Sequence, residues 1–302
     1  MASKFSKNYF VVILCAVFLL FSFNDVFAKS SKKSSHHRKH STSQSVQKKK
    51  GGLVLRSAAV IVKDQQTGKL LIQKQAKAVM PIASITKLMT AMVVLDAGLD
   101  PDETITIEEE DATAVRGTSF RLAVGTDLTR EEALLLALMS SDNRCAHALG
   151  RTYPGGYWNC VRAMNAKAAA LGLAHTRFRD TVGLSSNNVS SAKDLARLVD
   201  TAYQYEMIRD FTTRKKATIF TGWQMLKFRN TNQLVRDGCG WKIGLSNTGF
   251  TNEAGRCLVM QAKVAKRPLL IVLLDCRNNK ARINDANRIK SWLESKSHSQ
   301  HT

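Results

Sequence analysis

The sequence predicts an α+β domain in which an antiparallel sheet carries a helical layer and a helical insert. Two observations lead to this prediction. Runs of strand type open the apolar part of the chain and return in its last third, and helical patterns fill the region between them. Strands at both ends of a domain with helices between them favour one sheet covered by helices. The 302 residues, 44% of them apolar, are enough to build a sizeable core.

The first 28 residues have the pattern of a secretory signal. Two lysines precede an apolar run from Tyr9 to Phe23, and Val26-Phe27-Ala28 offers residues suited to cleavage. The alternative is an uncleaved membrane anchor, but the run is short for a bilayer span. We therefore expect residues 1–28 to be removed after Ala28 and the mature protein to be extracytoplasmic.

Residues 29–52 are predicted to form a disordered basic linker. They are mainly Ser, Lys, His and Gln, which cannot bury enough apolar surface to offset the entropy of ordering. The segment has no acid and eight cations: Lys29, Lys32, Lys33, Arg38, Lys39, Lys48, Lys49 and Lys50. With a net charge of +21, the chain suits anionic polymers or membrane surfaces. Nucleic acid is not an expected partner, because export removes the protein from it.

The predicted elements begin at Leu53. A Gly turn at residues 64–68 joins two strands into a hairpin, and Pro81 and Gly98 bracket the first helix. Residues 102–111 are an acidic stretch predicted to be extended, and Thr129 opens a helix with two glutamates in its first turn. The predicted strands are 53–62, 70–75, 242–245, 256–265 and 269–276, and the predicted helices are 84–95, 129–139, 144–153, 157–171, 194–204 and 286–293. The folded domain is expected to span residues 53–295, followed by a polar tail at 296–302.

The cysteines point to packing rather than chemistry. Five remain once Cys15 leaves with the signal, and their spacing fits no common zinc pattern. We expect small buried hydrophobes, with Cys239 and Cys257 as the best candidates for a disulfide, because they flank a predicted hairpin.

The tetrad Ser84-Ile85-Thr86-Lys87 at the start of the first helix is the strongest chemical signal. Residues three apart share a helix face, so the hydroxyl and the amine can lie within hydrogen-bond reach. Apolar residues follow Lys87, and desolvation lowers the pKa of an amine, which lets its neutral form accept the serine proton. By itself the tetrad also fits an N-capping serine followed by a surface lysine.

The triplet Ser141-Asp142-Asn143, between two predicted helices, strengthens the catalytic interpretation. A Ser–Lys nucleophile needs a second hydroxyl that relays a proton to the leaving amine and an amide that holds the substrate backbone. Ser141 and Asn143 supply these groups. S-x-x-K followed by S-D-N is the order found in penicillin-binding proteins and class A β-lactamases. The alternative for the triplet is a turn that links two helices.

With these motifs in place, the chain resembles the low-molecular-mass penicillin-binding proteins, specifically the D-alanyl-D-alanine endopeptidases of the penicillin-binding protein 7 type. The similar segments are Pro81–Thr90, Leu138–Arg144, Tyr153–Gly156, Met164–Ala168, Asp180–Leu184, Thr248–Thr251 and Ala254–Met260. The resemblance implies a penicillin-binding-protein/β-lactamase-like transpeptidase fold. It also implies a periplasmic enzyme that cuts peptidoglycan cross-links through an acyl-enzyme on Ser84, with Lys87 as proton acceptor, β-lactams as covalent inhibitors, and no metal or cofactor.

One motif departs from the family pattern. The third motif of the family is Lys-Thr-Gly on a strand beside the nucleophile, and here the matching substrate-binding triplet is Asn247-Thr248-Gly249. Asn247 can form hydrogen bonds but carries no charge, and charge-assisted hydrogen bonds are about twice as strong as neutral ones. We therefore expect weakened binding of the substrate carboxylate.

There are three alternatives to the endopeptidase. Class A β-lactamases use a glutamate for deacylation, but residues 144–205 contain none, only Asp180, Asp194 and Asp200. A D-alanyl-D-alanine carboxypeptidase would share the same chemistry and differ in the leaving amine. A catalytically weakened homologue that only binds cell wall is suggested by Asn247. His147 is expected to be a packed or surface residue, since the Ser–Lys pair already supplies a base.

Overall fold

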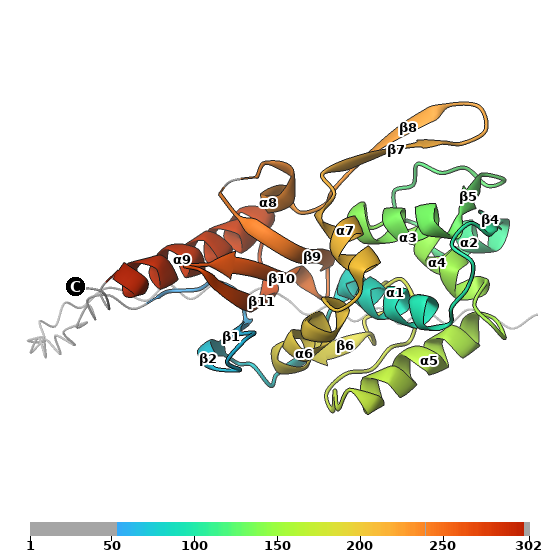
Figure 1. Cartoon of the computed structure of the whole chain (residues 1–302). Coiled ribbons are helices and arrows are strands. Elements are labelled where there is room, and N and C mark those ends of the chain that lie inside the picture. The colour runs from blue at the N-terminus through green and yellow to red at the C-terminus, as the bar shows by residue number, and fades with distance from the viewer. Residues whose placement is uncertain (1–52, 239, 299–302) are drawn as a thin grey trace, which may run out of the picture. The chain divides into compact units, whose positions relative to one another are not determined.

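A computed structural model describes residues 53–238 and 240–298. Its main sheet has five antiparallel strands in the order β2-β1-β11-β10-β9 (Figure 1). They are β1 (Ala59–Asp64), β2 (Leu70–Lys74), β9 (Lys242–Thr251), β10 (Gly255–Val264) and β11 (Arg267–Cys276). Ala59 of β1 lies opposite Leu274 of β11, so strands from both ends of the domain form one sheet, as predicted.

The sheet is covered on both faces because its central strands alternate between two cores. On β10, Leu258 and Met260 face a core formed with α9 (Asn279–His298), whereas Cys257 and Val259 face the helical part of the domain. This alternation is the period-2 pattern of a strand that is buried on both faces. The second core contains α1 (Thr86–Asp96) and α6 (Ala192–Ala202).

The remaining large helices form the insert beside α1. They are α3 (Arg130–Met139), α4 (Asn143–Arg151) and α5 (Tyr157–Ala170), close to the predicted ranges. A reciprocal capping box starts α3, in which Thr129 accepts from the backbone of Glu132 and the Glu132 side chain accepts from the Thr129 backbone. Local capping signals therefore set the start of this helix.

The prediction of an extended stretch over residues 102–111 was wrong for its second half. Only β4 (Thr104–Thr106) is extended, paired with β5 (Asp127–Thr129), and α2 (Glu109–Ala114) follows at once. Glu108 and Asp111 form a capping box that starts this helix. Acidic residues also stabilise the first turn of a helix through its dipole.

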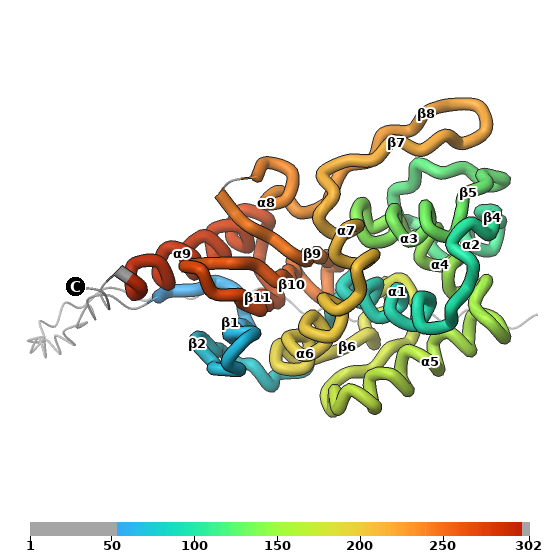
Figure 2. The backbone as a smooth tube through the Cα atoms, in the orientation of Figure 1, coloured from blue at the N-terminus to red at the C-terminus, as the bar shows by residue number. Residues whose placement is uncertain are grey.

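Several elements in the region 79–236 were not predicted. They are β3 (Val79–Pro81), which pairs with β6 (Val189–Ser191), α7 (Glu206–Thr213), α8 (Gln233–Arg236), and the hairpin of β7 (Lys216–Phe220) and β8 (Met225–Arg229). The hairpin projects from the body of the domain on the side of α3 (Figure 2). The closing helix α9 also begins seven residues before the predicted Ala286.

The cysteines of the described ranges are buried thiols. Cys145, Cys160, Cys257 and Cys276 are free, and burial raises the pKa of the Cys160 and Cys257 thiols to about 12, which makes them poor nucleophiles. The predicted partner of Cys257, Cys239, lies outside the described residues, as do the predicted signal and linker. Within the described ranges, no helix has both the length and the hydrophobicity needed to cross a bilayer.

Candidate active site

Ser84 lies at the junction of a short 3-10 turn and α1. The turn spans Ala83–Ile85, and Ala83 adopts a left-handed φ of +48°, which is uncommon for a residue with a side chain. This geometry presents Ser84 half-buried at the surface of the helical part, and Lys87 follows one turn later on the same helix face with 1% of its surface exposed. The predicted i, i+3 juxtaposition is therefore found.

The buried Lys87 amine is the centre of a cluster of polar groups. Its Nζ lies 2.9 Å from Ser84 Oγ, 2.8 Å from Asn143 Oδ1, 2.9 Å from the carbonyl oxygen of Val182 and 3.3 Å from Ser141 Oγ. Four of the predicted site residues, which are separated by up to 59 positions in the chain, thus meet around one nitrogen. The four contacts include two carbonyl oxygens that can only accept hydrogen bonds.

Burial lowers the pKa of Lys87 from 10.5 to about 7, because a charged amine is poorly solvated there. The carboxylates of Asp142 and Asp180 oppose this effect by attracting the charged form. The result is an amine that is substantially neutral near neutral pH. A neutral amine offers a lone pair to the nearby hydroxyl.

The Ser141-Asp142-Asn143 triplet forms the sharp turn between α3 and α4. Ser141 has a left-handed φ of +59°, which re-aims the chain at this point, and Asp142 caps α4 by accepting from the backbone of Cys145 at 3.0 Å. Asn143 is the first residue of α4. Non-glycine residues with such backbone strain are concentrated at functional sites. The carboxylate of Asp142 therefore has a structural role, because it caps α4.

A second loop, residues 180–188, supplies a contact that the sequence did not reveal. The carboxylate of Asp180 accepts from the backbone N–H groups of Val182, Gly183 and Ser185, which holds the Val182 carbonyl toward Lys87. Because the contact uses a backbone carbonyl, no residue type in the sequence marks it. In the sequence, the segment Asp180–Leu184 carries only the family resemblance.

Two glycines let neighbouring chain segments approach the backbone of Ser84. An ideal Cβ on Gly249 of β9 would lie 2.8 Å from the carbonyl oxygen of Ile82 and 3.1 Å from the amide nitrogen of Ser84. A Cβ on Gly183, which has φ of +93°, would lie 2.9 Å from the same nitrogen. Ser84 is thus clamped between β9 and the 180–188 loop, at a separation that only glycine allows.

The rest of the third predicted motif lies on the same edge strand. Asn247 is 4% exposed, and its Nδ2 has no hydrogen-bond partner among the described residues. Because side chains alternate along a strand, Asn247 shares the face of Gly249, which contacts Ser84. Thr248 donates from Oγ1 to Oγ1 of Thr231 at 2.7 Å, a partner that nothing in the sequence indicated.

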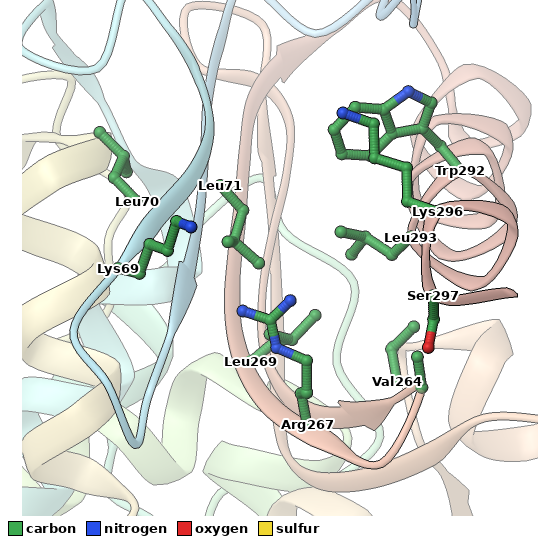
Figure 3. Close-up of a pocket in the computed structure, with 11 residues that line it drawn as sticks. Lys69, Leu70, Leu71, Val264, Arg267, Leu269, Trp292, Leu293, Lys296 and Ser297 are labelled. Atoms are coloured by element: carbon green, nitrogen blue, oxygen red, sulfur yellow. The ribbon is translucent and has the colours of Figure 1, made fainter. Parts of the chain in front are cut away.

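Two residues of the Lys87 cluster, Ser141 and Asn143, line a cleft of about 500 Å³. It is lined by Ser119, Phe120 and Arg121 of one loop, by residues 140–143, and by Lys227, Phe228 and Arg229 of β8. A separate hollow of about 260 Å³ lies between β2, the β10–β11 turn and α9, where Leu71, Leu269 and Leu293 form the walls (Figure 3). None of the predicted site residues lines that hollow, whereas Ser141 and Asn143 line the first cleft.

His147 lies outside the cluster, as expected for a packed histidine. Its Nδ1 is 2.7 Å from Asp111 Oδ1, and its ring stacks on Tyr157 with ring centroids 4.6 Å apart. Asp111 is fully buried and also pairs with Arg151. This network joins α2 to α4 and has no contact with Ser84 or Lys87 among the described residues.

Comparison with solved structures identifies the fold. The crystal structure of the Streptomyces K15 DD-transpeptidase superposes with a TM-score of 0.73 at 25% identity, covering 79% of this chain and 97% of that one. The predicted fold class is therefore confirmed, and the fold and site together define a serine enzyme of the penicillin-binding class.

Comparison with known sequences identifies the family. The profile described as D-alanyl-D-alanine carboxypeptidase, peptidase S11, matches residues 42–278. The chain belongs to this family of serine-type D-alanyl-D-alanine peptidases. A D-alanyl-D-alanine endopeptidase of Pseudomonas aeruginosa is 46% identical over 236 residues, which are 78% of this chain and 76% of that protein. A D-alanyl-D-alanine endopeptidase of Escherichia coli K12 is 43% identical over 237 residues, with the same two coverages.

Proposed function

We propose that this protein is a periplasmic D-alanyl-D-alanine endopeptidase that cleaves peptidoglycan cross-links through an acyl-enzyme on Ser84. The observation that carries the proposal is the 2.9 Å contact between the Lys87 amine and the Ser84 hydroxyl at a buried site. The similarity to two endopeptidases at 43–46% identity supports the choice of the cross-link as substrate.

Acylation begins with proton transfer from the Ser84 hydroxyl to the neutral amine of Lys87. The Ser84 oxygen attacks the carbonyl carbon of the D-alanyl residue, and a tetrahedral intermediate forms. Asn143 holds the substrate backbone through its side-chain amide. The positive charge gained by Lys87 then lies beside the developing negative charge, which stabilises the intermediate.

Collapse of the intermediate releases the amine of the second peptide. The proton on Lys87 passes to that amine through the hydroxyl of Ser141, which lies 3.3 Å from Lys87 Nζ. The amine leaves, and the acyl group remains as an ester on Ser84. Water then attacks the ester with Lys87 again as proton acceptor, so the free carboxylate is formed and Ser84 regains its proton.

In this proposal the third motif binds substrate without the positive charge that the lysine of the family supplies. The edge strand β9 beside Ser84 contains Asn247, Thr248 and Gly249. Thr248 and backbone donors of this strand hold the substrate. The Nδ2 of Asn247, which has no hydrogen-bond partner among the described residues, supplies a neutral donor. Residues 1–28 act as the export signal, residues 29–52 as a basic linker to anionic polymers or membrane surfaces, and residues 53–295 as the catalytic domain.

Labelling with a fluorescent penicillin tests the nucleophile. Wild-type protein should be labelled covalently, and Ser84→Ala should abolish the label while the fold is retained. Unlabelled wild-type protein would favour the second candidate, a wall-binding homologue whose catalysis is weakened by Asn247. That candidate is kept because an uncharged residue stands where the family has lysine.

Digestion of purified cross-linked wall tests the substrate. An endopeptidase converts dimeric muropeptides to monomers, and Ser84→Ala leaves them intact. Removal of only the terminal D-alanine, with dimers unchanged, would identify a carboxypeptidase and overturn the proposed specificity.

A further inference from the structure

The cleft beside Ser141 holds cations that the proposed chemistry does not use. Arg121 reaches it from the loop that precedes β5, and Lys227 and Arg229 reach it from β8. All three side chains belong to exposed residues. The single acid among the lining residues is Asp142, and its carboxylate already caps α4.

The cations of the hairpin have an unfavourable arrangement within the folded chain. Lys227 and Arg229 alternate with the buried Phe228, so they share one face of β8. Lys216 of β7 lies directly opposite Arg229, and like charges in that relation destabilise a hairpin. Within residues 53–238 and 240–298, neither Lys227 nor Arg229 has an ion pair. A negative partner from outside the chain would relieve this repulsion.

Arg121 fixes the geometry of the cleft. Its guanidinium donates to the carbonyl oxygen of Lys227 and lies 5.3 Å from the ring centroid of Phe228. On the same loop, Phe120 packs against the guanidinium of Arg144, 3.8 Å from the ring centroid. The loop and β8 are thus tied together across the cleft, which sets the position of the two hairpin cations.

We propose that Lys227 and Arg229 bind the carboxyl terminus of the peptide that leaves when a cross-link is cut. This inference rests on the proposed function, and it assigns to these two residues the preference for cross-linked over linear substrate. Ser141 lines both the Lys87 cluster and the cleft, and it is the hydroxyl that hands the proton to the leaving amine. The leaving peptide therefore extends from Ser141 into the cleft.

The chemistry of the two leaving groups explains the selectivity. A released D-alanine is one residue, and its carboxylate lies next to the amine. A peptide released from a cross-link has its own carboxyl terminus further along the chain, beyond the reach of the catalytic cluster. Two cations in a cleft whose lining includes Ser141 but not Ser84 match that second carboxylate, and charge-assisted hydrogen bonds give the contact its strength.

The test is the double variant Lys227→Gln/Arg229→Gln in the mature protein. We expect KM for a purified cross-linked dimer to rise about tenfold, with kcat within about twofold, because the variant loses the charge-assisted contacts to the carboxylate of the leaving peptide. Removal of D-alanine from a linear pentapeptide and acylation by fluorescent penicillin should stay at wild-type rates. Lys69→Gln/Lys263→Gln, which makes the same change of charge at two exposed lysines outside the cleft, is the matched control.

A second arm removes the charge from the substrate instead. For wild-type protein, amidation of the dimer at the carboxyl terminus of the leaving peptide should raise KM as much as the two hairpin substitutions do. For the double variant, amidation should not raise KM further. An unchanged KM for the dimer in the variant, equal losses on all three substrates, or additive effects of amidation and variant would each overturn the inference.

Failure of the proposed function gives a different result. If wild-type protein were labelled by penicillin yet left the dimer intact, the proposal of endopeptidase activity would be wrong. The cleft is then tested by calorimetric titration of the dimer into Ser84→Ala protein with and without the two hairpin substitutions. Tighter binding to the single variant supports the cleft, and equal binding overturns it.

Discussion

Nζ of Lys87 lies 2.9 Å from Oγ of Ser84, and the carbonyl oxygens of Asn143 and Val182 lie 2.8 Å and 2.9 Å from the same nitrogen. A neutral amine has two N–H groups and one lone pair. When the two carbonyl oxygens accept those N–H groups, the lone pair remains for the proton of Ser84. In the proposed mechanism, the hydrogen bonds that hold Lys87 therefore also orient it as a base.

The rate of acylation by penicillin should rise with pH and reach half its maximum near pH 7. The pKa of Lys87 is lowered to about 7, and only the neutral amine, which predominates above that pKa, can accept the serine proton. Second-order rate constants for a fluorescent penicillin, measured between about pH 5 and 9, report this pKa in the free enzyme. A rate that is flat over the range would contradict the assignment of Lys87 as the base.

Gly183→Ala should reduce acylation at least tenfold, because its Cβ would push the backbone of Ala83 and Ser84 out of place. Gly222→Ala in the β7–β8 turn is the matched control, since it has a similar φ of +87° but no atom within 4 Å of its Cβ position. Both variants carry the same kind of backbone strain. Equal acylation by the two variants would show that the close approach to Ser84 is unimportant.

Asn247→Lys should speed acylation by penicillin. The substitution restores a positive charge at the buried position beside Ser84, where Nδ2 of Asn247 now has no partner among the described residues. A charge-assisted contact to the carboxylate of penicillin is about twice as strong as a neutral one. The acylation rate constants of wild type and variant decide the question, with Asn247→Gln as an uncharged control. No gain would mean that the site has adapted to asparagine.

The penicilloyl adduct on Ser84 should be released slowly. The carboxylates of the three aspartates in residues 144–205 have other hydrogen-bond partners: Asp180 accepts from backbone N–H groups of its own loop, Asp194 from the backbone of His175, and Asp200 from Gln65. Within residues 53–238 and 240–298 none of these three has a hydrogen bond to Ser84, so none is placed to activate water in the manner of a class A β-lactamase. A chase of labelled protein with unlabelled penicillin measures the release. Turnover of penicillin at many molecules per second would refute this view.

Asp111→Asn should lower the free energy of unfolding by about 3 kcal/mol, because it leaves the paired Arg151 without its buried counter-charge. Asp210→Asn breaks the exposed pair with Arg214 and should cost less than about 1 kcal/mol. Urea denaturation of the two variants makes the comparison. Similar losses would mean that the α2–α4 network adds little to stability.

The comparisons confirm the family and the fold class predicted from the sequence, and the roles of the individual site residues remain predictions. The motifs at Ser84 and Ser141 could be recognised because each is a short run of residue types. Helix α2 was missed because its capping box uses Glu108 and Asp111, acids that also suit an extended acidic stretch. The hairpin β7–β8 was missed because its strands are half exposed and lack a strong apolar pattern.

The sequence by itself determined the five strands of the main sheet, the helices α1, α3, α4, α5, α6 and α9, and the residue types available for chemistry. These depend on interactions between residues a few positions apart, such as capping and the periodicity of apolar side chains. Only the tertiary structure decided that Val182 supplies a carbonyl to Lys87, that Gly183 and Gly249 clamp the backbone of Ser84, and that cations of the hairpin line the same cleft as Ser141. Those relations join segments far apart in the chain, and backbone groups take part in several of them, so no local pattern of side chains records them.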